Sequence, residues 1–136
     1  MILFINTADV SKVYLALVNQ GKIVHDWEFA AQYQQAEKLL PAIDRMLRKN
    51  KIKLKNLRAI GAVTGPGPFT ALRIGITVAN TLAWSQAILV FGIKLSEFEK
   101  APDLAKLIQC RAQKAKAGAL LEPFYGQEPN ITLKKK

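Results

Sequence analysis

Cysteine and histidine are nearly absent from this sequence of 136 residues, which contains one of each, Cys110 and His25. A single cysteine cannot form a disulfide within the chain, and this is typical of proteins from reducing compartments. The sequence shows no histidine and asparagine arrangement that would activate Cys110 as a nucleophile. His25 lies inside a strand-like pattern, so we expect no nucleophile and base pair and no metal site.

Acidic residues are also scarce, because 10 Asp and Glu stand against 20 Lys and Arg, giving a formal net charge of +10. Such an excess favours acidic partners or nucleic acid. No apolar run approaches the roughly 18 residues that a membrane span requires. The N-terminus has no basic segment before its apolar run, so we expect no signal peptide, no membrane association and a cytoplasmic protein.

Half of the residues are hydrophobic, which is ordinary for one globular domain with a core. The continuous apolar run at residues 1–5 predicts a strand buried on both faces. Residues 13–18 and 22–30 predict two more strands, joined by a tight turn at residues 19–21. Apolar runs at residues 59–64 and 87–93 complete a set of five predicted strands.

Helical spacing of apolar residues predicts a helix over residues 32–49, with Pro41 expected to kink it. A second helix is predicted over residues 68–84. Ser96 is expected to cap a short third helix, and a fourth should run from residue 102 to about 117. We expect residues 120–125 to return as a strand and residues 126–136 to form a mobile tail.

A glycine-rich turn joins the predicted strand at residues 59–64 to the second long helix. A strand, a glycine turn and a helix in this order mark a position where α/β proteins place ligands or partners, although most such turns are only connections. The glycine spacing matches neither a P-loop nor a dinucleotide fingerprint. The turn and the first helical residues read Gly65, Pro66, Gly67, Pro68, Phe69, Thr70, Ala71, Leu72, Arg73, Ile74 and Gly75.

Small residues recur every fourth position along this second helix. They form a seam that admits another backbone closely, either within the fold or from a partner helix. The members of the seam are Ala71, Gly75, Ala79 and Ala83.

Cations are concentrated between residues 45 and 58, where no acidic or aromatic residue intervenes. Either this is a solvated loop or it contacts nucleic-acid phosphates, in which case binding should weaken steeply with salt. The cations are Arg45, Arg48, Lys49, Lys51, Lys53, Lys55 and Arg58.

Residues 65–75 resemble the signature Gly-Pro-Gly-Ser-Phe-Thr-Gly-Leu-Arg-Ile-Gly of the TsaB (YeaZ) family, with departures at Pro68 and Ala71. Residues 2–7 resemble the opening strand of that family, and residues 37–43 resemble its first long helix. Residues 122–125 resemble its C-terminal Pro-x-Tyr strand. The resemblance is good over residues 1–98 and weak beyond them.

The resemblance implies an α/β fold, a single ribonuclease H-like or actin-like ATPase lobe with a mixed sheet of about five strands and flanking helices. Residues 1–118 would form this domain, and residues 119–136 a C-terminal strand and basic tail in a shortened form without a full second lobe. Related ATPases carry an Asp where Asn6 stands, and Asn lacks the charge that a hard cation prefers. We therefore expect no cofactor of its own, with ATP or ADP and magnesium at a complex interface.

The resemblance also implies a non-catalytic partner of a TsaD-like subunit in the threonylcarbamoyladenosine modification of tRNA. A TsaE-like ATPase would join that complex, tRNA would be an indirect partner, and the free chain would form a homodimer. The implied partner interface comprises Leu39, Ile43, Leu72, Ile76 and Ala79.

Two further sets of residues complete the implied sites. The glycine-turn motif comprises Gly65, Gly67, Phe69, Thr70, Arg73 and Gly75, and the candidate tRNA-contacting patch comprises Arg48, Lys49, Lys51, Lys53 and Lys55.

Two alternatives to this function remain open. The chain could be a small basic ribonuclease H-like module that binds nucleic acid directly, through its own charge. It could also be a vestigial nucleotide-binding protein, which Asn6 and the missing lobe disfavour.

Overall fold

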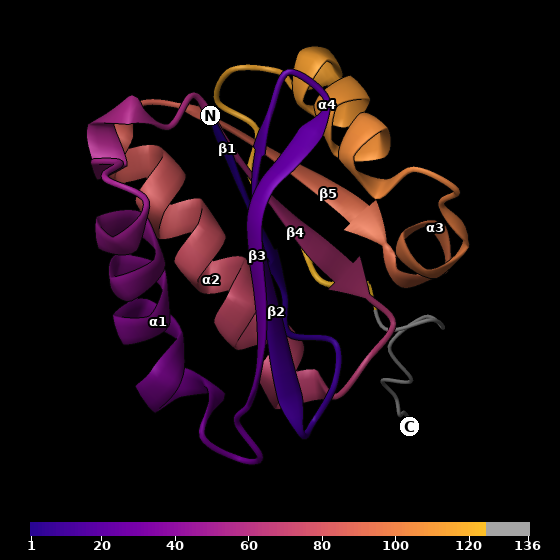
Figure 1. Ribbon diagram of the computed structural model, residues 1–136. Helices are drawn as coiled ribbons and strands as arrows, with labels where there is room; N and C mark the ends of the chain where they lie inside the picture. The colour runs from indigo at the N-terminus through magenta and orange to yellow at the C-terminus, as the bar shows by residue number, and fades with distance from the viewer. Residues whose placement is uncertain (125–136) are drawn as a thin grey trace.

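The fold is described for residues 1–124 of a computed structural model, built around one five-stranded mixed sheet (Figure 1). The predictions for Tyr125 and for residues 126–136 lie outside the described residues. The strands are β1 (Ile2–Asn6), β2 (Lys12–Asn19), β3 (Lys22–Ala30), β4 (Ala59–Gly65) and β5 (Leu89–Lys94).

The spatial order of the strands is β3-β2-β1-β4-β5. The first three strands form an antiparallel meander, whereas β4 and β5 run parallel to β1. The prediction that β1 is buried on both faces is confirmed, since Ile2, Leu3, Phe4 and Ile5 have no exposed surface. Alternate residues of β1 enter two separate core clusters, one on each face of the sheet.

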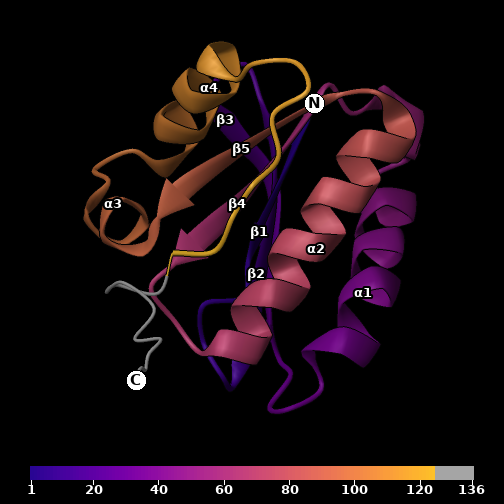
Figure 2. The same ribbon diagram turned by 180° about the vertical axis from the view of Figure 1, so that it is seen from behind.

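Helices cover both faces of the sheet (Figure 2). The two long helices, α1 (Gln35–Lys49) and α2 (Phe69–Gln86), lie side by side on one face. The shorter helices, α3 (Leu95–Lys100) and α4 (Leu104–Lys114), pack on the other. A single 3-10 turn, η1 (Leu54–Asn56), connects α1 to β4. The mixed sheet of five strands with flanking helices is therefore confirmed.

Several predicted boundaries were wrong. Helix α4 ends at Lys114 rather than near residue 117, and α1 begins at Gln35 rather than at residue 32. Ser96 lies inside α3 instead of capping it. The cap comes from Glu97, whose carboxylate accepts a hydrogen bond from the Lys94 N–H at 3.1 Å.

The strand predicted at residues 120–125 is not part of the sheet over its described residues. The segment is held by individual contacts instead. The Asn80 side chain accepts a hydrogen bond from the Leu121 N–H at 2.9 Å and donates one to the Leu121 carbonyl at 3.0 Å. The Phe124 N–H donates to the Thr64 carbonyl at 2.7 Å. Residues 119–124 therefore lie beside α2 and the end of β4 (Figure 2).

Candidate functional site

The glycines of the turn motif are required by close contacts within the chain. Gly65 has a φ angle of +128°, and a Cβ atom there would lie 1.9 Å from the Phe124 carbonyl oxygen. A Cβ atom on Gly75 would lie 2.3 Å from the Thr7 hydroxyl oxygen. Gly65 therefore allows the C-terminal segment to approach the end of β4, and Gly75 allows Thr7 to approach α2. Both roles are structural.

Thr7 ties β1 to the first turn of α2. Its buried hydroxyl donates a hydrogen bond to the Ala71 carbonyl at 2.6 Å. The preceding residue, Asn6, accepts a hydrogen bond from the Ala8 N–H at 2.8 Å, so its side chain closes the turn after β1. Sequence reasoning had considered Asn6 only as the counterpart of a phosphate-site Asp, and had not assigned Thr7 a contact.

The acidic residues near β1 and β3 are engaged in local contacts. Hydrogen bonds from the Ser11 hydroxyl and N–H lower the pKa of Asp9. Asp26 accepts a hydrogen bond from the Tyr14 hydroxyl at 2.9 Å, and burial followed by this bond raises the pKa of Tyr14. Glu28 forms an exposed ion pair with Lys12 at 3.6 Å. No group of three or more His, Cys, Asp or Glu residues that could hold a metal occurs within residues 1–124.

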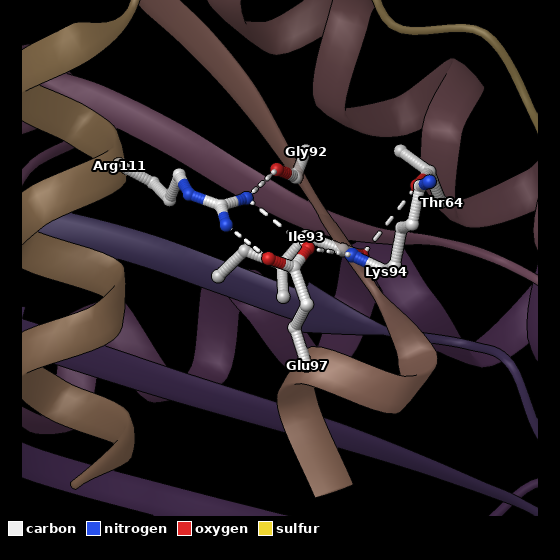
Figure 3. Close-up of polar contacts among 6 residues, drawn as sticks. All are labelled: Thr64, Gly92, Ile93, Lys94, Glu97 and Arg111. Atoms are coloured by element: carbon white, nitrogen blue, oxygen red, sulfur yellow. Dashed lines mark hydrogen bonds and ion pairs between the residues drawn. The ribbon is translucent and has the colours of Figure 1, made fainter. Parts of the chain in front are cut away.

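Another polar cluster lies where β5 meets α3 and α4 (Figure 3). The Arg111 guanidinium donates to the Glu97 carboxylate and, at 3.5 Å, to the Gly92 carbonyl. The hydrogen bond from Arg111, followed by that from the Lys94 N–H, lowers the pKa of Glu97. All of these groups are paired with one another, so the cluster fastens α3 and α4 to the sheet.

The structure corrects the predicted choice of interface residues. Each of the five is at most 4% exposed within the single chain, so none of these side chains is available to a docking partner. The seam of small residues on α2 is buried as well, because it packs toward the sheet. The five predicted residues are Leu39, Ile43, Leu72, Ile76 and Ala79.

The outward side of α1 and α2 nevertheless presents a largely apolar surface, which we call the docking face. Leu40 is 51% exposed and Phe69 is 55% exposed. Arg73 is the one charged residue of α2, and its guanidinium carbon lies 5.1 Å from the centroid of the Phe69 ring. Two hollows, each of about 360 Å³, mark this face. The docking face comprises Ala36, Leu40, Phe69, Thr70, Arg73, Ile74, Thr77, Val78 and Leu82.

The turn motif is thus divided by the fold. Its glycines face inward, with Gly65 and Gly75 buried, whereas Phe69, Thr70 and Arg73 project onto the docking face. Gly67 approaches the Ala8 backbone, since a Cβ atom there would lie 2.9 Å from the Ala8 carbonyl oxygen. The sequence signal that could have located this face is Phe69, a large apolar residue in the first turn of α2 that lies outside the seam of small residues.

The run of cations between residues 45 and 58 includes the five candidate tRNA-contacting residues, and we call the whole run the basic patch. It lies at the opposite end of the sheet from the glycine turn. Its residues surround the C-terminal end of α1, η1 and the start of β4, and all of them are exposed. Of its members, Arg48 alone forms an ion pair with a carboxylate of the described chain, Asp44 at 3.0 Å. The patch comprises Arg45, Arg48, Lys49, Lys51, Lys53, Lys55 and Arg58.

Cys110 is exposed on α4, apart from both surfaces. The Gln109 side chain beside it accepts a hydrogen bond from the Gly21 N–H at 3.2 Å.

None of the helices in the described part of the chain combines the length and apolar character needed to cross a bilayer.

Within residues 1–124, three antiparallel strands are followed by two strands parallel to the first, with two α-helices on each face. This arrangement defines one lobe of the actin-like and ribonuclease H-like α/β class. A family model described as TsaD, tRNA N6-adenosine threonylcarbamoyltransferase, matches residues 29–97. Because this match covers half of the chain, the protein belongs to that family, and within it to the TsaB/YeaZ group that its relatives represent.

Curated relatives carry the name tRNA threonylcarbamoyladenosine biosynthesis protein TsaB. The one from Buchnera aphidicola subsp. Schizaphis graminum is 36% identical over 76 residues, which cover 56% of this chain and 36% of the relative. The one from Bacillus subtilis is 28% identical over 96 residues, covering 71% of this chain and 42% of the relative. The chain therefore spans less than half of the length of these relatives.

A solved structure supports the fold. YeaZ from Pseudomonas aeruginosa superimposes with a TM-score of 0.64 at 24% sequence identity, covering 73% of this chain and 48% of that one. At this level of identity the likeness concerns the arrangement of strands and helices.

Proposed function

We propose that this chain is a non-catalytic partner in the threonylcarbamoyladenosine modification of tRNA, and that it binds a TsaD-like subunit through its docking face. The observation that carries the proposal is the partly apolar surface across α1 and α2, with Leu40 and Phe69 at least half exposed, in a chain related to TsaB proteins. The names of the relatives support the choice of pathway, and the docking face supports the mode of action.

The composition of the docking face suits a protein partner. Stable interfaces have an apolar centre from which charged residues are depleted, surrounded by a polar rim. Leu40 and Phe69 are more than half exposed. Binding would bury their apolar surface away from water, which is favourable. Arg73 at one end, and Asp44 with Arg48 at the other, would contribute to the rim.

The hydrogen bonds and ion pairs of the polar residues near β1 and β3 support a role without catalysis. Asn6 and Asp9 close the turn after β1, and Asp26 and Glu28 pair with Tyr14 and Lys12. Each group is engaged by its own neighbours at the surface, rather than directed toward a shared pocket with a nucleophile and a base.

In the absence of its partner, the same face would pair with a second copy of the chain. A two-fold pairing of one patch with itself is the common arrangement of homodimers. Self-pairing would exclude the TsaD-like subunit, because both use the docking face. A TsaE-like ATPase would therefore join only the heteromeric complex.

The test is size-exclusion chromatography with light scattering of the chain alone and mixed with the TsaD-like protein of the same organism. We expect a heteromeric peak with the unsubstituted chain and its loss with Leu40→Arg. Val24→Arg is the matched control, because Val24 is 50% exposed on β3 whereas Leu40 is 51% exposed on α1. Circular dichroism should show both variants folded.

Two results would contradict the proposal. A heteromeric peak that persists with a folded Leu40→Arg variant would rule out the docking face as the binding surface. Two unmixed peaks with the unsubstituted chain would rule out a stable complex altogether.

A further inference from the structure

We propose that this chain also binds RNA directly, on a surface formed by the basic patch together with a hollow between α1 and β3. The inference rests on the proposed function only in the choice of tRNA as the RNA to test. The proposed RNA surface meets the docking face only at Arg48 and Lys53. It assigns the excess positive charge of the chain a location and a ligand.

The cations of the basic patch are accessible for binding an external anion. All seven are exposed, and six of them form no ion pair with any carboxylate in residues 1–124. The exception, Arg48, pairs with Asp44, but 81% of the Arg48 side-chain surface remains accessible. A polyanion that binds here would displace mainly counterions and water rather than break internal ion pairs.

The patch curves around the C-terminal end of α1. Arg45 and Lys49 lie on the side of α1 that faces the edge strand β3. Arg48 and Lys53 lie on the side that faces α2, and Lys55 belongs to η1 beyond the helix end. A ligand that contacts the whole patch must therefore carry negative charges along an extended path, as a nucleic-acid backbone does.

The fold adds an aromatic residue to this patch that the sequence separates from it. Trp27 of β3 lies in a hollow of about 240 Å³ whose other walls are formed by His25, Asp26, Arg45, Met46 and Lys49. The Arg45 guanidinium carbon lies 5.8 Å from the centroid of the Trp27 ring. The sequence run of cations contains no aromatic residue, so this arrangement arises only when β3 and α1 pack together.

An aromatic ring flanked by cations favours RNA over the other polyanions. Unpaired bases of RNA stack on aromatic side chains and on arginine guanidinium planes, while lysines contact the phosphates on either side. An acidic protein surface would use the cations but not the Trp27 hollow. A regular duplex would use the phosphate contacts but keep its bases stacked inside.

The decisive experiment measures binding of fluorescently labelled, unmodified tRNA by anisotropy over a series of salt concentrations. The test variant is Lys49→Glu, Lys51→Glu, Lys55→Glu, which leaves the docking-face neighbours Arg48 and Lys53 in place. The control variant is Lys100→Glu, Lys114→Glu, Lys116→Glu. It has the same net charge and changes exposed lysines on or near α3 and α4.

We expect the test variant to bind tRNA at least about tenfold more weakly than the control, with a shallower dependence of log K on log salt. Equal binding by the two triple variants would overturn the proposal, since overall charge would then explain the affinity. Equal displacement of the tRNA by polyglutamate of matched charge would also overturn it, and would favour an acidic protein as the ligand.

A second measurement tests the hollow itself. The chain contains two tryptophans and three tyrosines. Trp84→Phe leaves Trp27 as the single tryptophan, and excitation at the long-wavelength edge of the tryptophan band avoids the tyrosines. Trp84 is 80% exposed, so the fold should tolerate its replacement. We expect bound tRNA to quench Trp27 emission. Unchanged emission at saturating tRNA would remove the hollow from the binding surface.

The two proposals can fail separately. If the test triple variant still forms a heteromeric complex with the TsaD-like protein, loss of tRNA binding concerns the basic patch alone. If tRNA binds in the predicted manner but no heteromer forms, the RNA surface stands and the partner role fails.

Discussion

At the scale of single residues, small side chains determine how closely the elements approach one another. Gly75 allows α2 to lie against Thr7, and the Thr7 hydroxyl then reaches the Ala71 carbonyl in the preceding turn. Gly75 and Thr7, the residue directly after β1, thus form one packing unit. A substitution at either position should be felt at the other, because residues in contact do not contribute independently to stability.

Gly75→Ala should therefore destabilise the fold by about 1–3 kcal/mol, the usual cost of forcing an extra methyl group into a packed site. The added Cβ atom would lie 2.3 Å from the Thr7 hydroxyl oxygen. Urea unfolding of the two single variants and of the Thr7→Ala, Gly75→Ala double variant measures the coupling. The cost of Gly75→Ala should be smaller beside Ala at position 7, and an unchanged cost would contradict this explanation.

The Glu97 and Arg111 pair should make stability depend on pH. Because the pKa of Glu97 is lowered in the folded chain, the stabilisation is present above the unfolded value of 4.5 and is lost as pH falls through the lower folded value. Glu97→Gln should therefore lower the unfolding midpoint at pH 7, and the difference from the unsubstituted chain should shrink below pH 4.5. Thermal unfolding across pH measures it.

Glu99→Gln is the control for this prediction. Glu99 is exposed on the same helix and forms no ion pair with the described residues. Its substitution should leave the unfolding midpoint at pH 7 nearly unchanged. A Glu97→Gln midpoint that differs by the same amount at all pH values would mean that the carboxylate charge is not responsible.

At the scale of whole elements, α2 performs two tasks with two sides. One side packs its small residues toward the sheet, and the other presents Phe69, Arg73 and Thr77. The helix has one charged residue and no side-chain cap at its N-terminus. Packing on the sheet, rather than local capping, therefore accounts for most of its stability.

The end of α2 offers a stability test. Ala87 follows the helix in the left-handed conformation, with a φ angle of +54°, where a Cβ atom is unfavourable. Ala87→Gly should raise the free energy of unfolding by up to about 1 kcal/mol. Ala115→Gly, after α4 at a φ angle of −67°, should bring no gain. Chemical denaturation distinguishes them, and equal effects would contradict the conformational argument.

The elements were largely predictable because their apolar periodicity is strong. Continuous apolar runs identified β1 and β4, and one-sided spacing identified α1. The interface residues were instead assigned from the resemblance, by motif position, and they fall on apolar positions that each helix buries against its own sheet. Leu39 and Leu40 are adjacent apolar residues, yet Leu39 is fully buried and Leu40 is half exposed.

The non-local contacts could not be predicted from the sequence. The pairing of Asn80 with Leu121 joins residues 41 positions apart, and no periodicity signals it. The packing of Trp27 against Arg45 likewise depends on the position of α1 over the edge of the sheet. Such arrangements follow from the tertiary fold, so the residues involved look ordinary in the linear chain.

At the scale of the whole molecule, positive charge is distributed unevenly over the surface. The docking face is nearly uncharged, whereas the basic patch occupies the end of the sheet where β1 and β4 begin. A chain with a net charge of +10 carries substantial self-repulsion, concentrated where the cations crowd around the end of α1. Two separate surfaces of different character can therefore engage two different partners.

This repulsion predicts that salt stabilises the free protein. Raising NaCl from about 20 mM to about 500 mM shortens the screening length to a few ångströms, so the thermal unfolding midpoint should rise. The triple variant Lys49→Glu, Lys51→Glu, Lys55→Glu should show a weaker rise. A midpoint that falls or stays constant with salt would indicate that the patch costs the fold little.

The contact between Asn80 and the backbone of Leu121 also bears on local opening. Residues 119–124 are held by two hydrogen bonds to the Asn80 side chain of α2, by one to the Thr64 carbonyl of β4, and by packing of Leu121 against the core. The segment can therefore detach while the five strands stay paired. Amide hydrogens of Leu121 and Phe124 should exchange with deuterium far sooner than those of β1, and Asn80→Ala should accelerate Leu121 selectively. The exchange rates of these two amide hydrogens thus report sub-global unfolding of the chain.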